Sequence, residues 1–179
     1  MRILGIDPGS TAMGWGVVDV EGKTPAHVAH GVLRPPRAAA LSTRLAFLYA
    51  ELVEVIAAHA PETAVVEKVF VATNPYSALV LGQARGCALA ALGAANLEVA
   101  EVAAREIKQA VVGSGAAEKR QVQAMVARLL HLDAPPPSDA ADALAAALCI
   151  AHQGPLAQLG VAVGARRRSR RQSGWRRNA

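Results

Sequence analysis

The sequence predicts an α/β fold in which a five-stranded mixed sheet is flanked by helices. Three short apolar segments separated by turn residues begin the chain, and two further short apolar segments lie between stretches of helical periodicity. The 179 residues suffice for one domain with a sizeable core. The composition, 53% hydrophobic and rich in alanine, excludes a disordered chain and argues against an all-β sandwich.

The first three strands are expected to form an antiparallel meander. The first strand ends at Asp7, and the next residues, Pro8 to Thr11, have the composition of a turn. The third strand is followed by Pro35 and Pro36, which cannot continue a ladder of hydrogen bonds. The three strands are expected at residues 2–6, 14–18 and 27–33.

The rest of the domain is expected to be helical, with two more strands inserted. Leucines and other apolar residues recur at three- and four-residue intervals from Leu41 onward, which is typical of an amphipathic helix. Asn74 suits the N-cap of a second helix, and Pro75 suits its first turn. Strands are expected at 64–67 and 99–102, and helices at 41–60, 75–95, 104–112, 117–131 and 138–152.

The charge divides the chain into a domain, residues 1–155, and a basic tail, residues 156–179, which we expect to be disordered. Residues 164–179 hold seven arginines and no acid, so the other 12 basic residues stand against 14 acidic ones. A basic tail on a slightly acidic domain indicates a polyanionic partner such as nucleic acid. A solubilising extension has the same composition, so this alternative stays open.

We expect a cytoplasmic protein that makes no use of a membrane. No stretch of about 18 uncharged apolar residues is present. The start of the chain, Met1 to Asp7, lacks the charged beginning and the long apolar region of a signal peptide.

Four acidic residues stand at unusual places in this pattern. Asp7 closes the first strand and Glu67 interrupts the fourth, where burial of a carboxylate is costly unless a cation compensates it. Asp139 and Asp142 are three residues apart at the start of the last helix, so they share one face. Taken singly, Asp7 also suits the start of a turn, and the helical pair also suits capping.

Taken together, the four acids predict a metal centre. If the first and fourth strands are neighbours, Asp7 and Glu67 emerge side by side and the last helix can add its two carboxylates. Each close pair of carboxylates, at about 4 Å and an effective dielectric constant near 20, costs roughly 4 kcal/mol. Two divalent cations would balance four such charges, and oxygen ligands suit Mg²⁺ or Mn²⁺.

Six short segments occur in order along the chain: GIDPGS from Gly5, EKVF from Glu67, LGQARG from Leu81, IKQ from Ile107, AEK from Ala117 and DAADAL from Asp139. Together they resemble the RuvC family of Holliday junction resolvases over residues 2–154. This resemblance implies a ribonuclease H-like fold. It also implies an endonuclease that cuts four-way DNA junctions by paired symmetric nicks and leaves 5′-phosphate and 3′-hydroxyl ends.

The resemblance also implies roles for individual residues. The family's metal-binding catalytic acids match Asp7, Glu67, Asp139 and Asp142, which would hold two Mg²⁺ ions per active site, with Mn²⁺ as a substitute. Some relatives carry a histidine at the position of Asp139. The residues expected to contact DNA are Lys108, Lys119, Arg105, Arg120 and Phe70, the last by stacking on unpaired bases. Without the resemblance, the basic residues suit a solvated helix surface and the phenylalanine suits a core.

Residues 75–95 are apolar around much of the expected helix, which suits partial burial by a second subunit. The family forms a homodimer through this region, and a twofold dimer carries two active sites. The resemblance further implies the branch-migration proteins RuvA and RuvB as partners.

Other functions stay open on the sequence alone. Residues 6–11 also resemble the first phosphate loop of actin-like ATPases and sugar kinases, but a second such loop is missing. A non-catalytic DNA-binding module could use the arginine tail but gains nothing from four acids. A generic ribonuclease H would share the acids without the LGQARG and EKVF segments.

Overall fold

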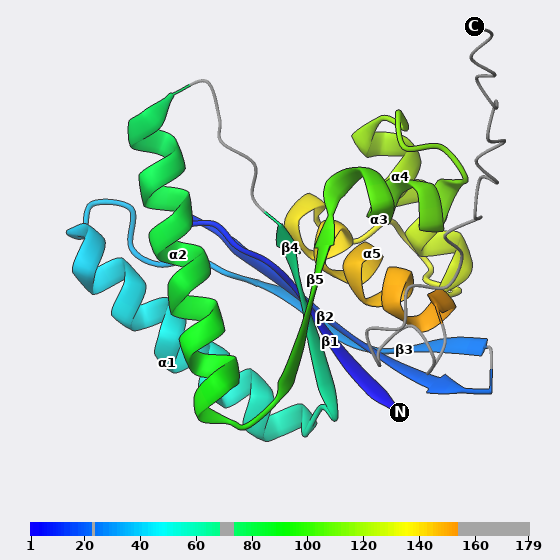
Figure 1. The fold of residues 1–179 in the computed structure, drawn as a ribbon, viewed down its shortest axis with the longest axis horizontal. Coiled ribbons are helices and arrows are strands. Elements are labelled where there is room, and N and C mark those ends of the chain that lie inside the picture. The colour runs from blue at the N-terminus through cyan, green and yellow to red at the C-terminus, as the bar shows by residue number, and fades with distance from the viewer. Residues whose placement is uncertain (23, 69–73, 154–179) are drawn as a thin grey trace, which may run out of the picture.

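Five strands form one mixed sheet in the computed structural model, which describes residues 1–22, 24–68 and 74–153. The strands are β1 (Arg2–Asp7), β2 (Met13–Glu21), β3 (Thr24–Leu33), β4 (Thr63–Lys68) and β5 (Glu98–Ala103). Their order across the sheet is β3-β2-β1-β4-β5 (Figure 1). The first three strands pair antiparallel, and β4 runs parallel to both β1 and β5. The predicted meander with added parallel strands is therefore confirmed.

The hairpin of β2 and β3 is longer than the sequence predicts. The ladder continues to the pair Glu21 and Thr24, and it includes Pro25 opposite Val20. A proline is tolerated here because β3 is the edge strand, whose outer side needs no hydrogen-bond donors.

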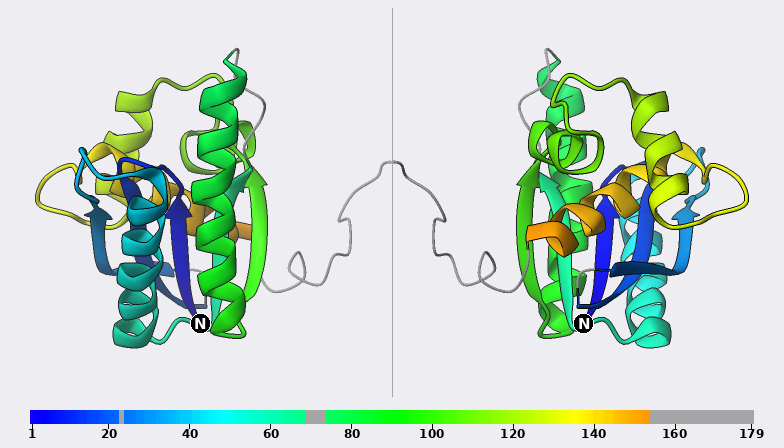
Figure 2. Two further views of the ribbon diagram at one scale, coloured as in Figure 1. Left: turned by 90° about the vertical axis from the view of Figure 1, so that its left-hand side faces the viewer. Right: turned by 90° about the vertical axis from the view of Figure 1, so that its right-hand side faces the viewer.

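In the described part of the chain, five helices cover the two faces of the sheet. They are α1 (Leu41–His59), α2 (Pro75–Ala94), α3 (Ala104–Val112), α4 (Lys119–Leu129) and α5 (Ser138–Gln153). Helices α1 and α2 pack together on one face, while α5, with α3 and α4 against it, covers the other (Figures 1 and 2). Successive β1 residues Ile3 and Leu4 enter the two separate apolar clusters that these layers enclose.

The helix ends follow local hydrogen bonding. The Asn74 side chain accepts hydrogen bonds from the backbone N–H groups of Tyr76 and Ser77, at 3.0 and 3.3 Å, so α2 begins as predicted. Helix α4 begins at Lys119, two residues later than predicted, because Glu118 is its N-cap. The Glu118 backbone N–H donates to the Gln121 side chain at 2.8 Å.

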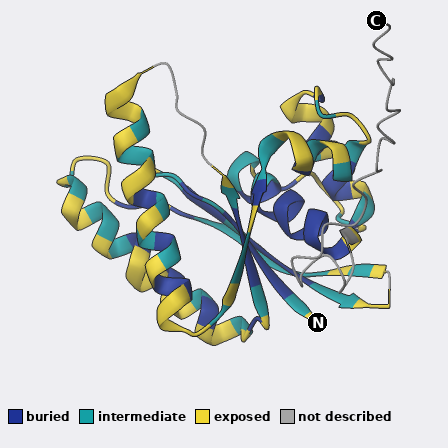
Figure 3. Ribbon diagram, in the orientation of Figure 1, coloured by how far each residue is buried: buried dark blue, intermediate teal, exposed yellow. Residues whose placement is uncertain are grey.

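Helix α5 lies unusually close to β1 and β2. Its buried side chains are mostly alanines, and Figure 3 shows it as the most continuously buried helix. A side chain at Gly5 would collide with the Ala143 carbonyl oxygen, and one at Gly14 would collide with the Asp139 carbonyl oxygen. Small residues on both sides therefore let the backbone of α5 rest directly on the sheet.

Helix α2 is the one helix among the described residues whose length and composition would allow it to cross a membrane. Only 22% of the relevant stretch is buried. Arg85 lies in the middle of this helix and binds Glu101, so no eighteen-residue stretch of it is free of charge. By themselves, length and composition are weak evidence for a membrane span. The expected basic tail at residues 156–179 lies outside the described residues.

Candidate active site

Two neighbouring parallel strands place Asp7 and Glu67 side by side. Ile6 of β1 is in register with Val66 of β4, and each acid is the next residue of its strand. Side chains alternate along a strand, so Asp7 shares the face of Gly5, which rests on α5. The two carboxylates therefore emerge at one end of the sheet on the face that α5 covers.

Helix α5 brings the other two acids to the same end. Gly14 pairs with Asp7 across β1 and β2, and the backbone of Asp139 lies directly over Gly14. One turn further along α5, Asp142 lines the same cavity as Glu67. The predicted convergence of these four sequence positions is therefore present in the arrangement of the backbone.

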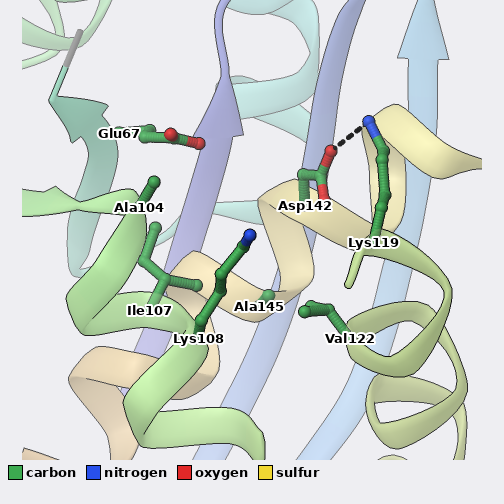
Figure 4. Close-up of a pocket in the computed structure, with 8 residues that line it drawn as sticks. All are labelled: Glu67, Ala104, Ile107, Lys108, Lys119, Val122, Asp142 and Ala145. Carbon is green, nitrogen blue, oxygen red and sulfur yellow. Dashed lines mark ion pairs between the residues drawn. The ribbon is translucent and has the colours of Figure 1, made fainter. Parts of the chain in front are cut away.

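A cavity of about 260 Å³ is lined by two of these acids, Glu67 and Asp142, and by two lysines. Lys108 rises from α3 into the space between Glu67 and Asp142, and Lys119 approaches from the first turn of α4 (Figure 4). The remaining walls are apolar. The full lining is Glu67, Ala104, Ile107, Lys108, Lys119, Val122, Asp142 and Ala145.

Burial and neighbouring acids raise the pKa of Asp7 and of Glu67. Burial, followed by the charges of Asp142 and Glu67, raises the pKa of Asp7 from 3.8 to about 7. Burial and Asp142 also raise the pKa of Glu67, while Lys119 and Lys108 act in the opposite direction. The site thus carries more negative charge than its two lysines neutralise, which favours a cationic ligand.

Two basic residues form ion pairs with the acids of α5. The Lys119 ammonium lies 2.7 Å from an Asp142 carboxylate oxygen, and Arg34 lies 3.8 Å from Asp139. Partial burial acts to lower the pKa of Lys119, but the hydrogen bond with Asp142 and the negative charges of Asp142, Asp7 and Asp139 together raise it above its usual value, so this lysine stays charged. Arg34 directly follows β3. No sequence pattern indicated that it belongs to the site, because its partner Asp139 is more than a hundred positions away.

The acids do not form a completed set of metal ligands. Within residues 1–22, 24–68 and 74–153, no three His, Cys, Asp or Glu side chains are grouped closely enough to hold one ion. The Asp139 and Asp142 carboxylates make their ion pairs with Arg34 and Lys119 instead. The donor chemistry nevertheless fits a hard divalent cation, because every candidate ligand is a carboxylate oxygen.

Of the five residues predicted to contact DNA, two line the acidic cavity. Lys108 and Lys119 line the cavity, as described. Arg105 is exposed and lines a separate shallow depression with Glu106 and Gln109, and Arg120 is exposed on α4. The structure does not bring these two arginines into the acidic cavity. Phe70 lies outside the described residues.

Comparisons with known proteins show which family this chain resembles. The family model described as Crossover junction endodeoxyribonuclease RuvC matches residues 3–152. A relative of that name from Alkalilimnicola ehrlichii is 58% identical over 152 residues, which are 85% of this chain and 92% of the relative. Another of that name, from Burkholderia multivorans, is 54% identical over 154 residues, which are 86% of this chain and 85% of the relative.

A solved structure, T. thermophilus RuvC in complex with Holliday junction substrate, superimposes with a TM-score of 0.80 at 34% identity. The match covers 89% of this chain and 96% of that one. The resemblance carried by the six sequence segments and the predicted ribonuclease H-like fold are both confirmed. The chain belongs to the RuvC family of crossover junction endodeoxyribonucleases.

Proposed function

We propose that this protein resolves four-way DNA junctions by hydrolysing one phosphodiester bond in each of two opposing strands. The observation that carries the proposal is the meeting of carboxylates from β1, β4 and α5 beside a cavity that two lysines enter. Acids and cations together suit phosphodiester hydrolysis, in which negative charge develops on a phosphate that is already negative. The products would be 5′-phosphate and 3′-hydroxyl ends, which a ligase can join.

Two Mg²⁺ ions, or Mn²⁺ in their place, would be held by Asp7, Glu67, Asp139 and Asp142. Bound divalent cations lower the pKa of an attacking water and stabilise the leaving oxygen. The chain itself contributes the acids that would bind and orient these ions. Among them, Asp7 has its pKa raised to about 7. Lys108 and Lys119 place ammonium groups in the same cavity, where they would neutralise a phosphate.

The wider DNA surface would include Arg105 and Arg120, which belong to α3 and α4, and Phe70, which follows β4 in sequence. Exposed basic side chains suit contacts with the sugar–phosphate backbone. An aromatic residue suits stacking on bases that are unpaired at the centre of a junction.

A homodimer would supply the two active sites that paired nicks require. Helix α2 carries exposed apolar side chains, with Tyr76 72% and Leu79 62% exposed. Exposed apolar surface of this kind favours association with another protein surface, and twofold symmetry matches that of a junction. RuvA and RuvB would be further partners, and the cytoplasm would be the place of action.

The rival functions are less well supported. A non-catalytic DNA-binding module gains nothing from Asp7 and Glu67, whose charges repel a phosphate backbone. An actin-like phosphate-binding domain would use Asp7 but leaves Lys108, Lys119 and Asp142 without a role.

The test is cleavage of a labelled mobile junction, an immobile junction, a duplex and a DNA–RNA hybrid, each with Mg²⁺ and with EDTA. We expect paired, symmetric nicks in junctions only, and only with Mg²⁺. Asp7→Asn is the matched inactive control, and it should still bind the junction. Equal cutting of duplex or hybrid would overturn the assignment to junctions.

A further inference from the structure

A second cavity, of about 300 Å³, lies on the opposite side of the sheet from α5. It is lined by residues of the first turn of α1, the first two turns of α2 and the loop that follows β1. Its lining is one guanidinium, three hydroxyl groups and two apolar side chains: Arg44, Ser10, Tyr76, Ser77, Val80 and Leu81. Among the residues that the structure describes, no carboxylate lines it.

Arg44 is the unusual member of this lining. Its Nε is buried, and in the described part of the chain it is the one buried side-chain nitrogen or oxygen that lacks a hydrogen-bond partner. A buried donor left unsatisfied costs about 1–3 kcal/mol, and more when the group is charged. A guanidinium only donates hydrogen bonds, so the missing partner is an acceptor.

The lining favours a phosphate as that acceptor. The planar guanidinium can donate two parallel hydrogen bonds to phosphate oxygens, and neighbouring hydroxyl groups can donate further ones. The backbone N–H groups of Tyr76 and Ser77 already donate to Asn74, so side chains rather than the helix terminus would hold the anion.

The position of the cavity identifies the source of the phosphate. Ser10 is three residues after Asp7, so their Cα atoms are at most about 11 Å apart. A strand of DNA carries one phosphate per nucleotide, so this distance corresponds to only a few nucleotides at most. A strand whose scissile phosphate lies at the acids is therefore long enough to reach this cavity.

We infer that the cavity around Arg44 is a binding subsite for a backbone phosphate of the substrate DNA, within a few nucleotides of the scissile bond. The inference rests on the proposed function for the identity of the substrate. The subsite would fix the strand's register against the acids without reading its sequence.

The first test is junction binding in Ca²⁺ across a series of salt concentrations, with Arg44→Gln compared with Arg128→Gln. Both variants lose one positive charge, but Arg128 is exposed near the end of α4. Loss of one phosphate contact should weaken binding about 10-fold and make the log–log salt slope shallower by about 0.9. Equal affinities and slopes for the two variants would overturn the inference.

Ser77→Asp keeps the test decisive if Arg44→Gln fails to fold. The new carboxylate would give Arg44 an internal partner, so the melting temperature should rise while junction affinity falls about 10-fold. Thr43→Asp is the matched control, since it adds the same charge at the same position of the first turn of α1, where Thr43 is exposed. If both variants weaken binding equally, the subsite is refuted.

An experiment with inorganic phosphate distinguishes two possible ligands of the cavity, the DNA backbone and a free anion. If phosphate at constant ionic strength stabilises the wild type but not Arg44→Gln, while junction affinity is unchanged between them, the site binds a free anion and the inference is wrong. Because these experiments measure binding, a wild type that binds junctions without cutting them would refute the proposed function alone.

Discussion

Replacing Asp7 by asparagine should remove nuclease activity and, in EDTA at pH 8, make the protein more stable. Asp7 is half-buried, and burial together with Asp142 and Glu67 raises its pKa from 3.8 to about 7. An ionised Asp7 is therefore unfavourable in the folded state. Asparagine has nearly the same shape and carries no charge.

The size of the effect follows from the pKa shift. The folded state binds the Asp7 proton more tightly than the unfolded state, so the contribution of Asp7 to the free energy of unfolding is most favourable below pH 4, falls between about pH 4 and pH 7, and is level above. About three pKa units correspond to about 4 kcal/mol at pH 8. Partial exposure and screening by salt reduce this to about 2 kcal/mol. For a domain of this size, that is a difference of about 4–8 °C in melting temperature.

The assay is thermal denaturation followed by circular dichroism at pH 5, 6, 7 and 8 in EDTA. The advantage of Asp7→Asn over the wild type should grow with pH, whereas Asp133→Asn, at an exposed loop position, should show no such trend. Addition of Mg²⁺ should stabilise the wild type more than Asp7→Asn. A variant that is less stable than the wild type at pH 8, or an advantage independent of pH, would refute the account of mutual repulsion.

Three further substitutions probe the rest of the site. Lys119→Met removes the 2.7 Å contact with Asp142, and we expect a roughly 100-fold lower cleavage rate with little change in junction affinity, measured by single-turnover kinetics. Gly14→Ala introduces a clash with the Asp139 carbonyl oxygen, so urea denaturation should show a loss of about 1–3 kcal/mol, whereas Gly82→Ala, which meets no atom, should show no loss. Leu79→Glu places a charge on the exposed apolar face of α2. Sedimentation should then show a monomer, and nicks in the two strands should become uncoupled; an unchanged dimer would place the interface elsewhere.

Local sequence patterns predicted the elements, while long-range packing decided the details of the site. An apolar run that ends in an acid marked Asp7 and Glu67, because few other arrangements place a carboxylate at the end of a buried strand. The sequence could not show that Arg34 pairs with Asp139 or that Arg44 lacks a partner, since both facts depend on elements distant in the chain. The backbone positions of the four acids follow the prediction, but their side chains do not form a group of three ligands. That difference reflects the two ion pairs made by the acids of α5.

The alanine-rich composition has a direct connection with the chemistry of the site. Asp139 and Asp142 reach the ends of β1 and β4 because α5 approaches the sheet at backbone distance, over Gly5 and Gly14. Larger side chains at the buried positions of α5, such as Ala140 and Ala143, would push the helix outward and carry both carboxylates with it. Stability alone would tolerate a wider spacing filled by larger apolar residues. The small residues of α5 and of the sheet beneath it are therefore best explained by the need to hold the four acids close together.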